Sequence, residues 1–107
     1  MGLQIFGRNK CFDTKKAERF FKERRVKYQY VDLDRYGISR GELTGVITAV
    51  GGWEKVVKDP SELQYFSKEA IITKLCDEPA LLVTPIVRNG KRAAVGADAE
   101  KWKELAE

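Results

Sequence analysis

The sequence predicts an α/β fold: a four-stranded mixed sheet with helices on its faces and an all-helical insert at about residues 39–78. Three observations lead to this prediction. Residues 3–34 read strand, helix, strand, the middle shows only helical signals, and residues 80–107 read strand, strand, helix. A strand–helix–strand unit joins parallel strands and a tight hairpin joins antiparallel ones, so the sheet is mixed. We expect residues 1–107 to form a single domain.

The N-terminal unit begins with the apolar run LQIF at residues 3–6, which is typical of a short buried strand. Residues 13–25 follow as an amphipathic helix, whose buried face carries the aromatic pair Phe20 and Phe21. Residues 26–34 alternate in polarity, which predicts a second strand.

The middle of the chain, residues 39–77, is predicted to be entirely helical. Ser39 and Glu42 have the spacing of a capping box, and Gly51-Gly52 is a typical helix end. One or two further helices are expected before Pro79, which ends the block.

The C-terminal unit contains two apolar runs on either side of RNGK at residues 88–91. Asn89-Gly90 between such runs predicts a hairpin with a type I′ turn. A last helix follows, with Asp98 as its cap and Trp102 and Leu105 on its inner face.

The composition excludes several classes of protein. With 43% hydrophobic and 34% charged residues the chain is typical of a globular protein that needs no disulfide to build its core. No apolar run approaches the roughly 20 residues of a membrane span, and the N-terminus does not resemble a secretory signal, so we expect a cytoplasmic protein without membrane contact. The absence of histidine excludes Ser-His-Asp and Cys-His catalysis, and with two cysteines it makes a metal site improbable.

Charge is unevenly distributed along the chain. Residues 8–27 contain nine Lys or Arg and three acidic residues, a balance of +6, so the remainder of the +4 chain carries −2. Such a cluster can contact an acidic partner or can be a solvated helix face. No direct nucleic-acid contact is expected, because the chain lacks the basic groove with interleaved aromatics of a single-strand binder.

Cys11 stands just before the first predicted helix, and this position favours an activated thiol. Unpaired N–H groups at a helix start stabilise a thiolate, and Arg8 and Lys10 add nearby positive charge. Thr14, three residues further on, can donate its hydroxyl hydrogen to the sulfur. These effects would lower the thiol pKa from about 8.5 into the range of about 3.5–7.5. The alternative is that Cys11 is a remnant without a substrate.

The order of elements is that of the thioredoxin fold. The segments IFGRNKCFDTKKAERFF and TPIVRNGKRAAVG, at residues 5–21 and 84–96, resemble the arsenate reductase (ArsC)/Spx family. The resemblance covers essentially the whole chain, including the helical insert. It implies a cis peptide bond before Pro85 and a substrate-binding backbone edge at Thr84 that faces Cys11. The proline could instead only set a turn between core strands.

The chain departs from this family where arsenate would bind. The family's arsenate reductases carry three arginines around the oxyanion, and the residues here are Thr84 before the proline and Val95 past the hairpin. Arg92 lies three residues earlier and could contact an anion or simply keep the hairpin soluble. In the insert the nearest candidates are Arg40 and Lys55, and neither matches convincingly.

Three functions remain open. The first is a thiol-dependent oxidoreductase with Cys11 as nucleophile, no bound cofactor and glutathione as a co-substrate, working with a small thiol or a thiol–disulfide protein such as a glutaredoxin. The second is an Spx-like regulator that binds the RNA polymerase α subunit, although Thr14 replaces the second cysteine of the Spx Cys-x-x-Cys switch. The third, a true arsenate reductase, is disfavoured by the missing arginines. Cys76 could resolve a Cys11 disulfide, but core packing is the commoner role of a buried free cysteine.

Overall fold

The computed structural model describes residues 2–106 and confirms the α/β fold with a four-stranded mixed sheet of order β2-β1-β3-β4. The inner strand β1 runs parallel to β2 and antiparallel to β3, the other inner strand, and β3 runs antiparallel to β4. The strands are β1 (Leu3–Gly7), β2 (Tyr28–Asp32), β3 (Ile86–Asn89) and β4 (Arg92–Val95).

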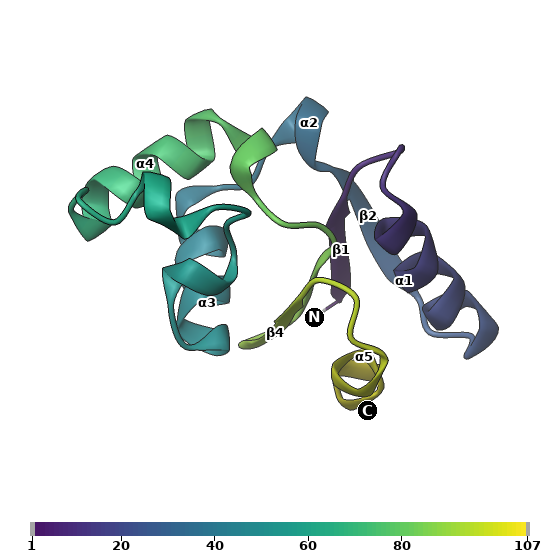
Figure 1. The fold of residues 1–107 in the computed structure, drawn as a ribbon. Coiled ribbons are helices and arrows are strands. Elements are labelled where there is room, and N and C mark those ends of the chain that lie inside the picture. Colours follow the sequence, from purple (N-terminus) through teal and green to yellow (C-terminus); the bar gives the residue numbers. More distant parts are fainter. Residues whose placement is uncertain (1, 107) are drawn as a thin grey trace.

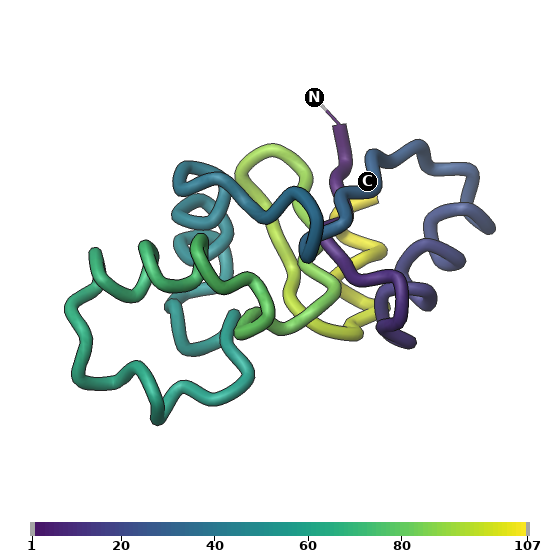
Figure 2. Tube along the Cα trace, turned by 90° about the horizontal axis from the view of Figure 1, so that it is seen from above, coloured from purple at the N-terminus to yellow at the C-terminus, as the bar shows by residue number. Residues whose placement is uncertain are grey.

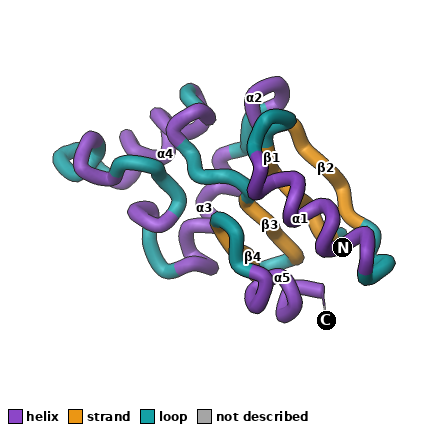
Figure 3. Tube along the Cα trace, turned by 45° about the vertical axis from the view of Figure 1, so that its right-hand side comes forward, coloured by secondary structure: helices purple, strands orange, loops and turns teal. Residues whose placement is uncertain are grey.

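Helices cover both faces of this sheet (Figure 1). They are α1 (Phe12–Glu23), α2 (Leu33–Tyr36), α3 (Arg40–Val50), α4 (Lys68–Asp77) and α5 (Ala99–Ala106). The helices α1 and α5 pack on one face of the sheet and α3 and α4 on the other (Figure 1). Figure 3 shows the strands in orange, with α3 and α4 to their left. No helix in residues 2–106 combines the length and the apolar character that crossing a membrane requires.

The strands divide the core into two clusters, because successive side chains point to opposite faces of a sheet. On β1, Leu3 and Ile5 pack with α1 and α5, whereas Phe6 packs with the helices of the insert. In the α1/α5 cluster Phe21 is fully buried, and the centroid of its ring lies 6.4 Å from that of Trp102. This packing fixes α1, and with it the start of the helix, against the sheet.

The second strand is shorter than the sequence predicts. It ends at Asp32, and residues 33–36 turn into the short helix α2. Asp32 caps this helix, since its carboxylate accepts the N–H of Asp34 at 3.2 Å, and Leu33 is fully buried. The alternation of polarity could not reveal this change, because a buried leucine between two aspartates fits either conformation.

The insert is helical only in part. The Ser39–Glu42 capping box of α3 is present as predicted. Between α3 and α4, however, the chain forms short 3₁₀ turns and an extended piece in which Val57 bridges Leu82. This bridge ties the insert to the segment that precedes Pro85. In Figure 2 the insert extends to one side of the sheet.

The hairpin differs from the predicted one by one residue. Asn89 still belongs to β3 and pairs with Arg92, so the two turn residues are Gly90 and Lys91. Among these two only Gly90 has a positive φ, at +65°. Positive φ at the first turn position alone is the pattern of a II′ turn, so the predicted type I′ turn is wrong.

Candidate functional site

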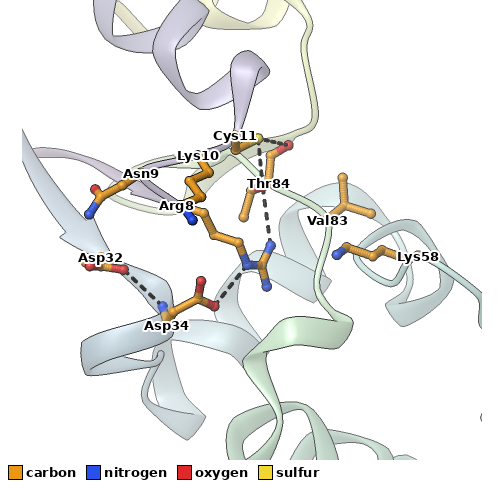
Figure 4. A pocket seen from close by; sticks show the side chains of 9 residues that line it. All are labelled: Arg8, Asn9, Lys10, Cys11, Asp32, Asp34, Lys58, Val83 and Thr84. Carbon is orange, nitrogen blue, oxygen red and sulfur yellow. Dashed lines mark hydrogen bonds and ion pairs between the residues drawn. The ribbon is translucent and has the colours of Figure 1, made fainter.

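Cys11 lies where the β1–α1 loop meets the segment before β3 (Figure 4). It is the N-cap residue of α1, and its backbone N–H donates to the carbonyl of Arg8 at 3.0 Å. A cleft of about 640 Å³ opens beside it. Its lining comes from the β1–α1 loop, the β2–α2 turn, the insert and the segment before β3: Arg8, Asn9, Lys10, Cys11, Asp32, Asp34, Lys58, Val83 and Thr84. A half-exposed thiol at the wall of a cleft can meet a ligand.

The sulfur of Cys11 is surrounded by hydrogen-bond donors. Oγ1 of Thr84 donates to Sγ at 3.1 Å, and the Thr84 carbonyl lies 3.8 Å from it, within reach of a thiol hydrogen. Burial alone raises the pKa of Cys11, but hydrogen bonds from the side chains of Thr14 and Thr84 and from the backbone N–H groups of Thr14 and Asp13 outweigh it. The net effect lowers the pKa of Cys11 from its ordinary value. The thiolate is therefore favoured by hydrogen bonds at the helix start.

Thr14, at the start of α1, packs unusually closely against the end of β1. It is buried, with 1% of its surface exposed, and it packs on Gly7 at the end of β1. A Cβ on Gly7 would lie 2.2 Å from Cγ2 and 2.7 Å from Oγ1 of Thr14. Only glycine therefore allows β1 and α1 to approach this closely.

The two cations proposed from the sequence as thiolate support have different positions. Lys10 is exposed at the rim of the cleft. Arg8 turns its guanidinium away from the loop, where Nε pairs with Asp34 at 3.0 Å and Nη1 donates to Oγ1 of Thr84 at 3.3 Å. The hydrogen bonds of the two threonines and the helix N–H groups, rather than direct contacts of these cations, account for the lowered pKa of Cys11.

The segment before β3 completes the cleft. The Thr84-Pro85 peptide bond is cis, as the family resemblance implied, and both residues are buried. The hydroxyl of Thr84 faces Cys11, so this segment lies directly beside the thiol.

The structure does not bring Arg92 to the thiol, so the predicted contact of Arg92 with a substrate anion at Cys11 is wrong. In the β3–β4 register Val95 is opposite Ile86, which follows Pro85, whereas Arg92 is opposite Asn89 at the hairpin. Three residues along a strand separate the two ends by about 10 Å. The guanidinium of Arg92 donates to the carbonyl of Glu104 on α5 at 2.9 Å.

Cys76 is also absent from the cleft. It lies in the last turn of α4, half-buried, and packs against the cluster formed by the insert. Burial raises the pKa of its thiol, an effect that Arg40 partly offsets. This environment is that of a packing cysteine.

Several lining residues escaped the sequence analysis, above all Asp34 and Lys58. Asp34 reaches the cleft because α2 turns the chain back after β2. Lys58 is held at the cleft by a backbone hydrogen bond, in which its N–H donates to the carbonyl of Leu81 at 3.0 Å. The pair of aspartates at the end of β2 was a usable signal for Asp34, whereas no local pattern marks Lys58.

A reduced cysteine that caps the first helix beside a cis-proline segment places the chain among the thiol oxidoreductase-like proteins of the thioredoxin fold. Comparison with known families is more specific. The chain belongs to the ArsC family, whose model matches residues 6–105. A search of curated proteins found no match.

Solved structures with the same fold share little sequence with this chain. A putative ArsC family related protein from Bacteroides fragilis superposes with a TM-score of 0.86 at 19% identity, with 98% of both chains covered. An arsenate reductase from Vibrio cholerae gives 0.84 at 20% identity, again with 98% of both chains covered. A glutaredoxin from Archaeoglobus fulgidus gives 0.51 at 21% identity, over 98% of this chain and 86% of the other.

Proposed function

We propose that the protein is a thiol–disulfide oxidoreductase in which Cys11 is the only nucleophile. The observation that carries the proposal is the sulfur itself, half-exposed in a cleft and hydrogen-bonded by Thr84 at 3.1 Å and by Thr14. A thiolate is the attacking species in disulfide exchange, and these contacts favour it.

The reaction proceeds by two exchanges. The Cys11 thiolate attacks one sulfur of a disulfide, so a new S–S bond forms, the old one breaks, and the second sulfur leaves as a thiolate that takes a proton from water. An external thiol then attacks the mixed disulfide on Cys11 and releases the Cys11 thiolate. The external thiol, from glutathione or a glutaredoxin-like protein, ends in a disulfide with the group that Cys11 had captured, so each cycle releases one thiol of the substrate and transfers the disulfide to the external thiol. Cys76 takes no part because it does not line the cleft.

The charged side chains that line the cleft are three cations and two carboxylates, a balance of +1: Arg8, Lys10, Lys58, Asp32 and Asp34. This balance favours an anionic partner such as glutathione, which carries two carboxylates. Lys10 and Lys58 are exposed on two sides of the lining, and neither has an ion pair within the described residues 2–106. The backbone of Val83 and Thr84, beside the thiol, is the edge along which an extended peptide would lie.

An exchange assay tests this proposal and its pH dependence. Incubation with a mixed disulfide of glutathione and cysteine, plus glutathione, should form glutathione disulfide faster than the uncatalysed reaction. Because the pKa of Cys11 is lowered, the rate of the first exchange, measured as release of cysteine before glutathione is added, should rise with pH through that pKa and level off below about pH 8.5, the ordinary thiol value. An unchanged background rate with this substrate and with a glutathionylated protein would contradict the proposal.

A second candidate is supported by the surface of α1. Its basic side chains Lys15, Lys16, Arg19 and Lys22 are exposed, and so is 70% of Phe12. A basic, partly aromatic face fits an acidic protein surface, such as a regulator would use on the RNA polymerase α subunit. Co-purification with that subunit at low and moderate salt would support this function. A Lys15→Glu, Lys16→Glu variant should then lose the interaction, and retention by the variant would exclude α1 as the contact.

Arsenate reduction should be absent. Thr84 and Val95 occupy the two positions where the family's arsenate reductases carry arginine, and Arg8 is already held by Asp34. We expect no turnover of arsenate with glutathione and glutaredoxin above a Cys11→Ser control. Measurable turnover that requires Cys11 would show that the oxyanion is bound by other groups of the cleft.

A further inference from the structure

Arg8 donates to the hydroxyls of Thr14 and Thr84, the two side chains that lower the pKa of Cys11. Its backbone N–H donates to Oγ1 of Thr14 at 3.4 Å, and Nη1 of its guanidinium donates to Oγ1 of Thr84 at 3.3 Å. Thr84 in turn donates to Sγ at 3.1 Å, and Thr14 also lowers the pKa of Cys11. A chain of hydrogen bonds thus leads from the guanidinium of Arg8 through Thr84 to the sulfur.

The direction of these hydrogen bonds follows from the donors available. A threonine hydroxyl has one hydrogen and accepts through its lone pairs, whereas a guanidinium can only donate. When Oγ1 of Thr84 accepts from Arg8, its single hydrogen remains for another acceptor. The same guanidinium also donates hydrogen bonds to the neighbouring carbonyls of Leu82, at 3.0 Å, and Pro79. The sulfur is then the acceptor left for the Thr84 hydrogen.

We propose that Arg8 is a positioning residue, which turns the hydroxyl hydrogen of Thr84 onto the sulfur of Cys11 and so maintains the reactive thiolate. This inference rests on the proposed role of Cys11 as a nucleophile. Arg8 need not touch the substrate, because it acts through Thr84.

The environment of Arg8 indicates that it orients the Thr84 hydroxyl rather than stabilising the thiolate by its charge. Its side chain is only 14% exposed, and Asp34 holds Nε at 3.0 Å, so the guanidinium is fixed and its charge is largely balanced. Balanced charge leaves little direct Coulombic effect on the sulfur. The other charged or titratable groups around Cys11 are Lys10 on the loop, Asp13 on α1, Tyr30 and Asp32 on β2, and Lys58 in the insert.

A double-mutant cycle separates orientation from charge. In a Cys76→Ala background, the rate of Cys11 alkylation is measured against pH for Arg8→Met, Thr84→Val and the double variant. We expect Arg8→Met to raise the midpoint by about one pH unit, which is a tenfold lower alkylation rate at pH values below both midpoints. Because Arg8 acts through the Thr84 hydroxyl, the same change in the Thr84→Val background should have less than a twofold effect.

Two further variants keep the test decisive. Arg88→Met is the matched control, since Arg88 is also a half-buried arginine, bound to Gln4, but lies outside the cleft, and it should leave the midpoint unchanged. If Arg8→Met does not fold, Arg8→Lys replaces it, because lysine keeps the charge but lacks the planar fork that reaches Thr84 and Leu82 together.

The possible results are distinct. Equal effects of the Arg8 change with and without the Thr84 hydroxyl would mean that Arg8 acts by charge, and would overturn the inference. So would a midpoint unaffected by Arg8→Met or Arg8→Lys in a folded protein. If the unsubstituted protein itself shows an ordinary midpoint and no exchange activity, the proposed function fails first.

Discussion

Replacing Cys11 with serine should reduce disulfide exchange to the uncatalysed rate while leaving the fold intact. Among the described residues 2–106, Cys11 is the only cysteine that lines the cleft, and a serine hydroxyl does not attack disulfides. Serine is also a preferred N-cap, and Cys11 makes no side-chain cap hydrogen bond to α1. We therefore expect stability to be unchanged or raised by up to about 1 kcal/mol.

Cys76→Ala is the control variant for the loss of exchange in Cys11→Ser. Cys76 packs in the insert, outside the cleft, so the exchange rate should be retained even if stability falls somewhat. Exchange rates of both variants are measured together with urea unfolding curves. If Cys11→Ser keeps exchange activity and loses it only when Cys76 is also replaced, Cys76 is the nucleophile and the proposed role of Cys11 is wrong.

Replacing Gly7 with alanine should both destabilise the protein and weaken the thiolate. The added Cβ would lie 2.2 Å from Cγ2 of Thr14, and Thr14 is buried and β-branched, so it has little freedom to move. Overpacking of this kind typically costs about 1–3 kcal/mol. Displacing Thr14 also removes its hydrogen bond to Sγ, so the pKa of Cys11 should rise.

Gly45 provides the matched control for this substitution. It lies within α3, and a Cβ there meets nothing within 4 Å. Gly45→Ala should therefore stabilise the protein by about 1 kcal/mol, because alanine favours the helix more than glycine does. Urea unfolding and the pH dependence of Cys11 alkylation are measured for both. A Gly7→Ala protein as stable as the parent, with an unshifted midpoint, would show that the contact with Thr14 does not matter.

Much of the fold was predictable because its signals are local. The capping box at Ser39, the Asp98 cap of α5 and the apolar face around Phe21 each report on neighbouring residues, and the structure contains all three. The errors occur where a tertiary contact decides the conformation. The chain leaves β2 and forms α2 at Leu33, whose side chain is fully buried there. The bridge between Val57 and Leu82 interrupts the predicted helical insert.

Only the part of the candidate site that lies at the start of α1 was predictable from the sequence. Cys11 and Thr14 were identifiable because both belong to one helix start, where position along the chain fixes proximity. The link from Arg8 to Thr84 spans 76 residues and depends on how the loop before β3 folds back. Arg92 was misassigned because its place depends on the strand register, which sequence spacing did not fix.

The most direct test of this account is the pKa of Cys11 in the intact protein, measured by alkylation at a series of pH values and resolved from Cys76 by peptide mass analysis. We expect a midpoint clearly below about 8.5 for Cys11 and above it for Cys76, since hydrogen bonds favour one thiolate and burial disfavours the other. A Cys11 midpoint at or above about 8.5 would contradict the claim that this helix start activates the thiol.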